Sequence, residues 1–185
     1  MIRSFGRRGF LCFLMAVVLT GCASGVTRHT DAEKRQAYFK GGGKVARAVT
    51  VSLDKNAQQQ LPDNITFDKD QFLATVKRLL DAKGLLAKTP DEKLPTIEIV
   101  VTDIRVRSNL SAIFWGFMAG DDHIIGEVVA RNSDGKELQR FQVSASYALG
   151  GFGGGQDNTR MGWLYETFAQ EMTNELTGTT SETSQ

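Results

Sequence analysis

Cysteine, histidine and proline are scarce in this 185-residue chain, which has two, two and three of them. Cys12 lies in an apolar leader and Cys22 directly follows it, so we expect no disulfide in the folded protein. His29 and His123 are far apart in the sequence and have no free cysteine to complete a familiar metal set. Ser144 also lacks a nearby base. These shortages predict no metal site, no cofactor and no catalytic set, and therefore a protein that is not an enzyme.

The chain also lacks an apolar run long enough to cross a bilayer. Residues 10–20 are uncharged, but a spanning helix needs roughly twenty apolar residues. Arg3, Arg7 and Arg8 precede the run, which is typical of a signal-peptide core. We expect residues 1–21 to be a signal peptide that is removed on export. The general secretory route is favoured, and the arginine pair leaves the twin-arginine route as the alternative.

The four residues that end this run are Leu19, Thr20, Gly21 and Cys22. They resemble the lipobox of bacterial lipoproteins, L-[AST]-[GA]-C. The resemblance implies that Cys22 carries a diacylglycerol anchor and a further acyl chain such as palmitate, and that it becomes the first residue after cleavage. Three acyl chains hold a protein on a bilayer without a spanning helix. Because Ala23 is not the aspartate that resembles an inner-membrane retention signal, we expect a bacterial outer-membrane protein whose domain faces the periplasm.

Composition divides the remaining chain into three parts. Residues 22–43 are polar and end in three glycines, which predicts a flexible tether after the lipidated cysteine. Residues 44–177 have the size of one domain. Residues 178–185 lack large apolar side chains, which predicts a disordered tail. Charges of both signs are nearly balanced and do not cluster, so nucleic acid is not expected as a partner.

Hydrophobic periodicity predicts the elements of this domain. Four stretches alternate as strands do: residues 45–53, 96–107, 123–131 and 141–147. The apolar parity changes near Thr102 and Asp103, which predicts a bulge there. Helical spacing follows Asp68, which resembles a capping residue, and a second amphipathic helix begins near Asp157 or Asn158. The order β-α-β-β-β-α predicts an α+β fold: a four-stranded sheet with two amphipathic helices on one face.

A glycine-rich stretch before the last helix is the first candidate site. It contains Gly150, Gly151, Gly153, Gly154 and Gly155 and leads to Arg160. Backbone amides at the start of a helix, together with an arginine, suit an anion or a small ligand. The stretch has no phosphate-loop signature, so a flexible or closely packed connection is the alternative.

The apolar stretch at residues 110–120 is the second candidate. It contains more large apolar side chains than a connection needs, among them Phe114, Trp115, Phe117 and Met118. These side chains either form a contact surface for a partner or for lipid, or they fold back as a lid on the core.

Two stretches carry a family resemblance: FWGFMAGDDHIIGEVVARNSDGKELQRF at 114–141 and SASYALGGFGGGQDNTRMGWLYETFAQEM at 144–172. Their A-G-x-x-x-I-x-x-E-V run, D-G turn and glycine-rich entry to the last helix resemble the bacterial family domain of unknown function 4410, which is common among envelope lipoproteins. The resemblance covers about residues 44–177 and implies one domain. It implies no activity and no site residues.

These features favour a non-catalytic, lipid-anchored protein whose periplasmic domain binds another component of the cell envelope. We expect two partners, the membrane through the lipid and an envelope protein through the domain. The alternative is a periplasmic module that binds a small ligand or an anion at the glycine-rich stretch.

Overall fold

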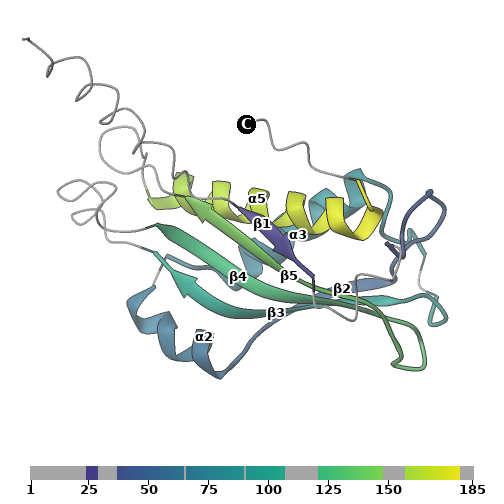
Figure 1. Ribbon diagram of the computed structural model, residues 1–185, viewed down its shortest axis with the longest axis horizontal. Helices are drawn as coiled ribbons and strands as arrows, with labels where there is room; N and C mark the ends of the chain where they lie inside the picture. The colour runs from purple at the N-terminus through teal and green to yellow at the C-terminus, as the bar shows by residue number, and fades with distance from the viewer. Residues whose placement is uncertain are drawn as a thin grey trace, which may run out of the picture.

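The computed structural model describes residues 24–28, 37–64, 66–89, 91–106, 121–147 and 157–179. These residues form a mixed α+β fold with one five-stranded sheet, three α-helices and a short 3₁₀ helix (Figure 1). Within these ranges, none of the helices has the length and apolar character that a bilayer crossing requires. The predicted signal peptide and most of the predicted tail lie outside the described residues.

The sheet has the strand order β1-β5-β4-β3-β2. Its strands are β1 (Gly25–Thr27), β2 (Ala48–Leu53), β3 (Thr96–Arg105), β4 (Asp122–Arg131) and β5 (Glu137–Tyr147). β2 and β3 are parallel, and the other neighbours are antiparallel. The prediction of four strands was wrong by one. The fifth strand, β1, lies in the stretch that composition assigned to a tether. Periodicity does not reveal it, because three residues are too few to show an alternating pattern.

Most of the buried apolar residues of the strands lie on one face of the sheet. In β3 this face passes from Val101 to Ile104, because the register with β4 shifts between Val101 and Asp103. The shift is the predicted β-bulge, and it restores the inward direction of the apolar side chains. It also places Asp103 opposite Ile125, on the other face of the sheet, which we refer to as the open face.

Helices α3 (Lys69–Ala82) and α5 (Asp157–Thr177) lie together on the apolar face (Figure 1). Their buried side chains include Phe72, Val76, Leu80, Leu164, Phe168 and Met172. A Cβ atom at Gly126 of β4 would lie 3.1 Å from the ring of Phe168, so the glycine lets α5 approach the sheet closely. Two helices on one face were predicted, and the structure confirms this arrangement.

Asp68 caps α3, as its position before the apolar stripe predicts. Its carboxylate accepts hydrogen bonds from the amides of Asp70 and Gln71. The amide of Asp68 itself donates to the hydroxyl of Tyr165 in α5, over 2.8 Å. The start of α3 is therefore attached to α5.

A third helix, α2 (Lys55–Gln60), and the 3₁₀ helix η1 (Leu61–Asp63) were not predicted. The described order is therefore β-β-α-α-β-β-β-α, without counting η1, instead of β-α-β-β-β-α. Hydrophobic periodicity misses α2 because Ala57 is its one buried residue. The helix begins at Asp54, whose side chain accepts the amide of Ala57 over 2.8 Å.

The N-terminal segment is packed against the rest of the fold. Arg28, directly after β1, makes two hydrogen bonds of 2.6 and 2.7 Å to the carboxylate of Glu175 in α5. Phe39 is buried, and its amide donates to the carbonyl of Leu176 over 3.1 Å. Packed residues thus occur before residue 44, where composition placed the start of the domain.

Candidate functional site

The connections at residues 106–121 and 148–156 start from the same end of the sheet. Arg105 at the end of β3 lies opposite His123 of β4, and Asp122 lies opposite Tyr147 at the end of β5. The chain returns from this edge in α5. We refer to this end of the strands as the loop edge. Its described residues that concern the site are Ser24, Asp103, Asp121, Asp122, His123, Tyr147, Arg160 and Trp163. At the opposite end of the sheet, the turn edge consists of residues 131–137, where a tight turn joins β4 to β5.

Most of the site residues predicted from sequence lie outside the described residues. These are Leu19, Thr20, Gly21 and Cys22 of the lipobox, Phe114, Trp115, Phe117 and Met118 of the apolar stretch, and Gly150, Gly151, Gly153, Gly154 and Gly155 of the glycine-rich stretch. The structure does show where the flanking residues lie. Asp121 follows the apolar stretch and Tyr147 precedes the glycine-rich one, and both belong to the loop edge.

Arg160 is the predicted site residue that the structure describes, and it is buried. Its Nη1 atom donates to Oδ2 of Asp122 over 2.6 Å, and the two side chains are 1% and 0% exposed. The pair joins the first turn of α5 to the start of β4. An anion at Arg160 would have to compete with this carboxylate for the guanidinium group.

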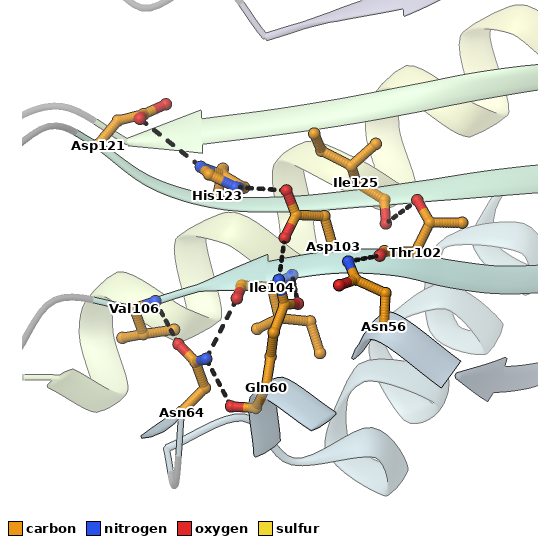
Figure 2. Close-up of polar contacts among 10 residues, drawn as sticks. All are labelled: Asn56, Gln60, Asn64, Thr102, Asp103, Ile104, Val106, Asp121, His123 and Ile125. Carbon is orange, nitrogen blue, oxygen red and sulfur yellow. Dashed lines mark hydrogen bonds and ion pairs between the residues drawn. The ribbon is translucent and has the colours of Figure 1, made fainter. Parts of the chain in front are cut away.

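His123 lies between two aspartates on the open face (Figure 2). Its Nε2 atom is 3.2 Å from Oδ2 of Asp103, in the bulge of β3. Its Nδ1 atom is 3.6 Å from Oδ1 of Asp121. A protonated ring can donate to both carboxylates, whereas a neutral ring can donate to one. The cluster thus links the bulge of β3 to the start of β4.

The described geometry of this cluster does not fit a serine nucleophile with a histidine base, and it does not fit a metal site. Ser146 lies opposite His123 in the register of β4 and β5, as a nucleophile might. Both ring nitrogens of His123 face aspartates, however, so neither faces the serine as a base would. In the part of the chain that the structure describes, no group of three or more histidine, cysteine, aspartate or glutamate side chains is placed to hold a metal ion.

Three amide side chains cover the edge of β3 that β2 does not reach (Figure 2). β2 ends at Leu53, opposite Val101, and α2 follows. Asn56 donates to the carbonyl of Thr102 over 2.8 Å, and Gln60 accepts the amide of Ile104 over 2.8 Å. Asn64 donates to the carbonyl of Ile104 over 3.1 Å and accepts the amide of Val106 over 2.5 Å. These side chains replace the backbone groups of a further strand.

This amide ladder, Asn56, Gln60 and Asn64, also contacts the histidine cluster. The Nε2 atom of Gln60 donates to Oδ1 of Asp103 over 2.6 Å. Sequence analysis missed the ladder, although amide residues recur at every fourth position from Asn56. That spacing places side chains on one side of a helix, and it is the signal that was available.

An aromatic pair, the exposed Trp163 and the half-buried Tyr147, lies on the β5 side of the loop edge. Trp163 of α5 is 44% exposed, and it is the one large apolar side chain of the described residues that is exposed. Its ring centroid lies 4.9 Å from that of Tyr147. Ser24 lies beside the same strand end, where its Oγ accepts the amide of Ser146 over 3.0 Å. Trp163 was not predicted as a site residue. It lies in an amphipathic helix whose other large apolar side chains are buried, and periodicity alone does not mark it as exposed.

Two side chains away from these clusters have displaced pKa values. On the open face, hydrogen bonds to Glu137 and Glu127 raise the pKa of the Arg140 guanidinium above its usual range. Burial raises the pKa of Tyr165 to about 12. Arg140 therefore remains charged, and Tyr165 remains neutral at physiological pH.

The elements described so far define an α+β domain in which α3 and α5 cover one face of the sheet, and in which the connections at residues 106–121 and 148–156 start at the loop edge. The chain belongs to the family described as "Domain of unknown function (DUF4410)", which matches residues 42–151. This match confirms the family resemblance noted in the sequence. No curated protein matches the chain.

Several solved structures match the chain at low sequence identity. Two are PelC dodecamers from Paraburkholderia phytofirmans. A point variant in space group C2 has 12% identity and a TM-score of 0.48, and covers 84% of this chain and 99% of its own. The form in space group P6 has 11% identity and a TM-score of 0.41, with the same coverage. A crystal structure of an uncharacterized protein has 15% identity and a TM-score of 0.40, and covers 72% of this chain and 90% of its own.

Proposed function

We propose that this protein is a lipid-anchored protein of the outer membrane whose periplasmic domain binds another component of the cell envelope. The observation that carries the proposal is the position of β1. Gly25, three residues after Cys22, pairs with Ser144 of β5. The acylated residue therefore lies close in the chain to the loop edge, from which the apolar connection also starts.

We assign the contact with the envelope component to residues 107–120. Asp121 flanks this connection, and the histidine cluster holds the strands on both sides of it. The amide ladder occupies the neighbouring edge of β3, so a partner cannot add a strand there. We place the contact on side chains of the connection, among them Phe114 and Trp115.

A second candidate is a small-ligand or anion-binding module at the glycine-rich connection. The start of α5 directly after residues 148–156 favours it, because amides at a helix N-terminus suit an anion. The bond of Arg160 to Asp122 counts against it. A rise in melting temperature on adding a ligand such as inorganic phosphate, without a protein partner, would favour this module over docking.

The anchor is tested by labelling cells with a fatty-acid probe. The Cys22→Ser variant should lose the label, because a hydroxyl does not replace the thiol as acyl acceptor. Ala23→Asp should move part of the protein to the inner membrane in an enteric host, as density-gradient fractionation would show. Continued labelling of the Cys22→Ser variant would contradict the anchor.

The contact is tested with a photo-crosslinking residue placed at position 115 and, as a matched control, at position 134 of the turn edge. Both proteins should be labelled by the fatty-acid probe. We expect one protein adduct at position 115 that is missing at position 134. The same adduct pattern at both positions would contradict a contact through residues 107–120.

A further inference from the structure

We propose that the lipid anchor holds the domain in one orientation, with the β5 side of the loop edge on the bilayer surface and Tyr147 and Trp163 among the lipid headgroups. This inference rests on the proposed lipidation of Cys22. It adds a second contact with the membrane, made by the folded domain itself.

The distance along the chain between the anchor and the fold is short. Ala23 alone separates Cys22 from Ser24, and two residues span at most about 7 Å. Ser24 is held by two contacts with the backbone of Ser146, of 3.0 and 3.3 Å. At the other end of β1, Arg28 is bound to Glu175. A segment fixed at both ends cannot serve as a long flexible tether.

The direction of β1 determines where the chain that precedes it leads. The strand is antiparallel to β5, with Gly25 opposite Ser144 and Thr27 opposite Gln142. The chain that precedes Gly25 therefore leads toward the C-terminal end of β5. That end is Tyr147, whose ring lies 4.9 Å from the ring of Trp163. The acyl chains thus start close to this aromatic pair.

The surface beside the anchor contains a tryptophan and a tyrosine. Tryptophan and tyrosine are enriched where membranes meet water, since each has an apolar body and a polar group. Trp163 is 44% exposed in a helix whose other large apolar side chains are buried. Two of the neighbouring charges, Asp122 opposite Tyr147 and Arg160 one turn before Trp163, are buried and bind each other. Contact with headgroups therefore requires no further desolvation of this pair.

One consequence concerns the proposed partner. Asp121, which directly follows the apolar stretch, belongs to the same loop edge as the aromatic pair. We therefore expect the component that residues 107–120 contact to be associated with the membrane.

The two tryptophans of the chain, Trp115 and Trp163, make the orientation measurable. Trp115→Phe leaves Trp163 as the only tryptophan. The lipidated protein is reconstituted in vesicles of phosphatidylethanolamine and phosphatidylglycerol, with acyl chains that are either unmodified or brominated near the headgroup. We expect bromination to lower Trp163 emission about twofold, because interfacial side chains reach the headgroup boundary.

Two controls separate orientation from simple proximity. The first combines Trp115→Phe, Trp163→Phe and Asp134→Trp, which moves the tryptophan to the turn edge and should remove the quenching. The second inserts a glycine-serine segment of about twelve residues between Ala23 and Ser24, which frees the domain from the short connection. Its Trp163 quenching should fall toward that of the position-134 control.

Fatty-acid labelling of the same samples distinguishes the two proposals. An unlabelled protein overturns the proposed anchor and, with it, the orientation. A labelled protein whose Trp163 is not quenched, or is quenched as strongly as a tryptophan at position 134, overturns the orientation and leaves the anchor intact. Selective quenching at position 163 that the inserted segment reduces supports the orientation.

Discussion

The two edges of the sheet are held by interactions of different range. At the turn edge, Asn132 accepts the amides of Asp134 and Lys136 over 3.1 and 2.8 Å, and Gly135 has a φ of +79°. At the loop edge, the ties join residues separated by 20, 38 and 122 positions: His123 with Asp103, Arg160 with Asp122, and Ser24 with Ser146.

The two edges also differ in the kinds of residue that hold them. The turn edge uses residues that suit a tight turn and can form from its own few residues. The loop edge contains a buried ion pair and an exposed tryptophan, and neither is the most stable choice for its position. Departures from local consistency of this kind are expected at functional sites.

The largest expected effect comes from breaking the buried pair. Arg160→Met leaves the carboxylate of Asp122 buried without its cation and should destabilise the protein by about 3 to 5 kcal/mol in urea unfolding. Arg131→Met is the matched control beside the turn edge, where Arg131 binds Glu98 over 3.0 Å in a half-exposed pair. That control should cost at most about 1 kcal/mol. Equal losses would remove the distinction between the two edges.

The amide ladder should give the next largest effect. Asn64→Leu leaves the amide of Val106 and the carbonyl of Ile104 without their side-chain partner, at a cost of about 1 to 3 kcal/mol. Asn56→Leu is the matched control, since Asn56 is exposed and its carbonyl partner can bind water instead. Urea midpoints of the two variants test this order, and a greater loss for Asn56→Leu would contradict it.

The turn edge should respond to a change in backbone conformation alone. Gly135→Ala places a side chain at φ +79° and should cost about 1 to 2 kcal/mol. Gly162→Ala in α5 is the control, because its Cβ would have no heavy atom within 4 Å and alanine favours a helix by about 1 kcal/mol. Thermal unfolding should therefore show opposite shifts, and a stabilised Gly135→Ala variant would show that the turn does not require glycine.

The last effect should be visible only at alkaline pH. Burial raises the pKa of Tyr165 to about 12, whereas a tyrosine in the unfolded chain ionises near about 10. The unfolded state therefore loses this proton first, and stability should fall as the pH rises from about 10 through about 12, with no effect below that window. Tyr165→Phe should lack this component of the fall, and Tyr38→Phe should keep it. Identical pH profiles for all three proteins would contradict it.

Sequence alone determined the elements whose signals are local. The apolar stripes of α3 and α5, the four longer strands, the bulge at Asp103 and the turn at Gly135 each depend on neighbouring residues. Side-chain periodicity and backbone preference express such features within a short window. The family resemblance and the predicted lipid attachment at Cys22 also come from local motifs.

Tertiary structure alone decided which of these parts meet. Nothing within residues 25–27 marks a strand, because the hydrogen bonds of β1 are supplied by β5, more than one hundred residues later in the chain. The pairing of Arg160 with Asp122 and the contact of Trp163 with Tyr147 likewise depend on α5 crossing the sheet. Packing of distant segments therefore placed the aromatic pair beside the predicted anchor, which no local pattern could specify.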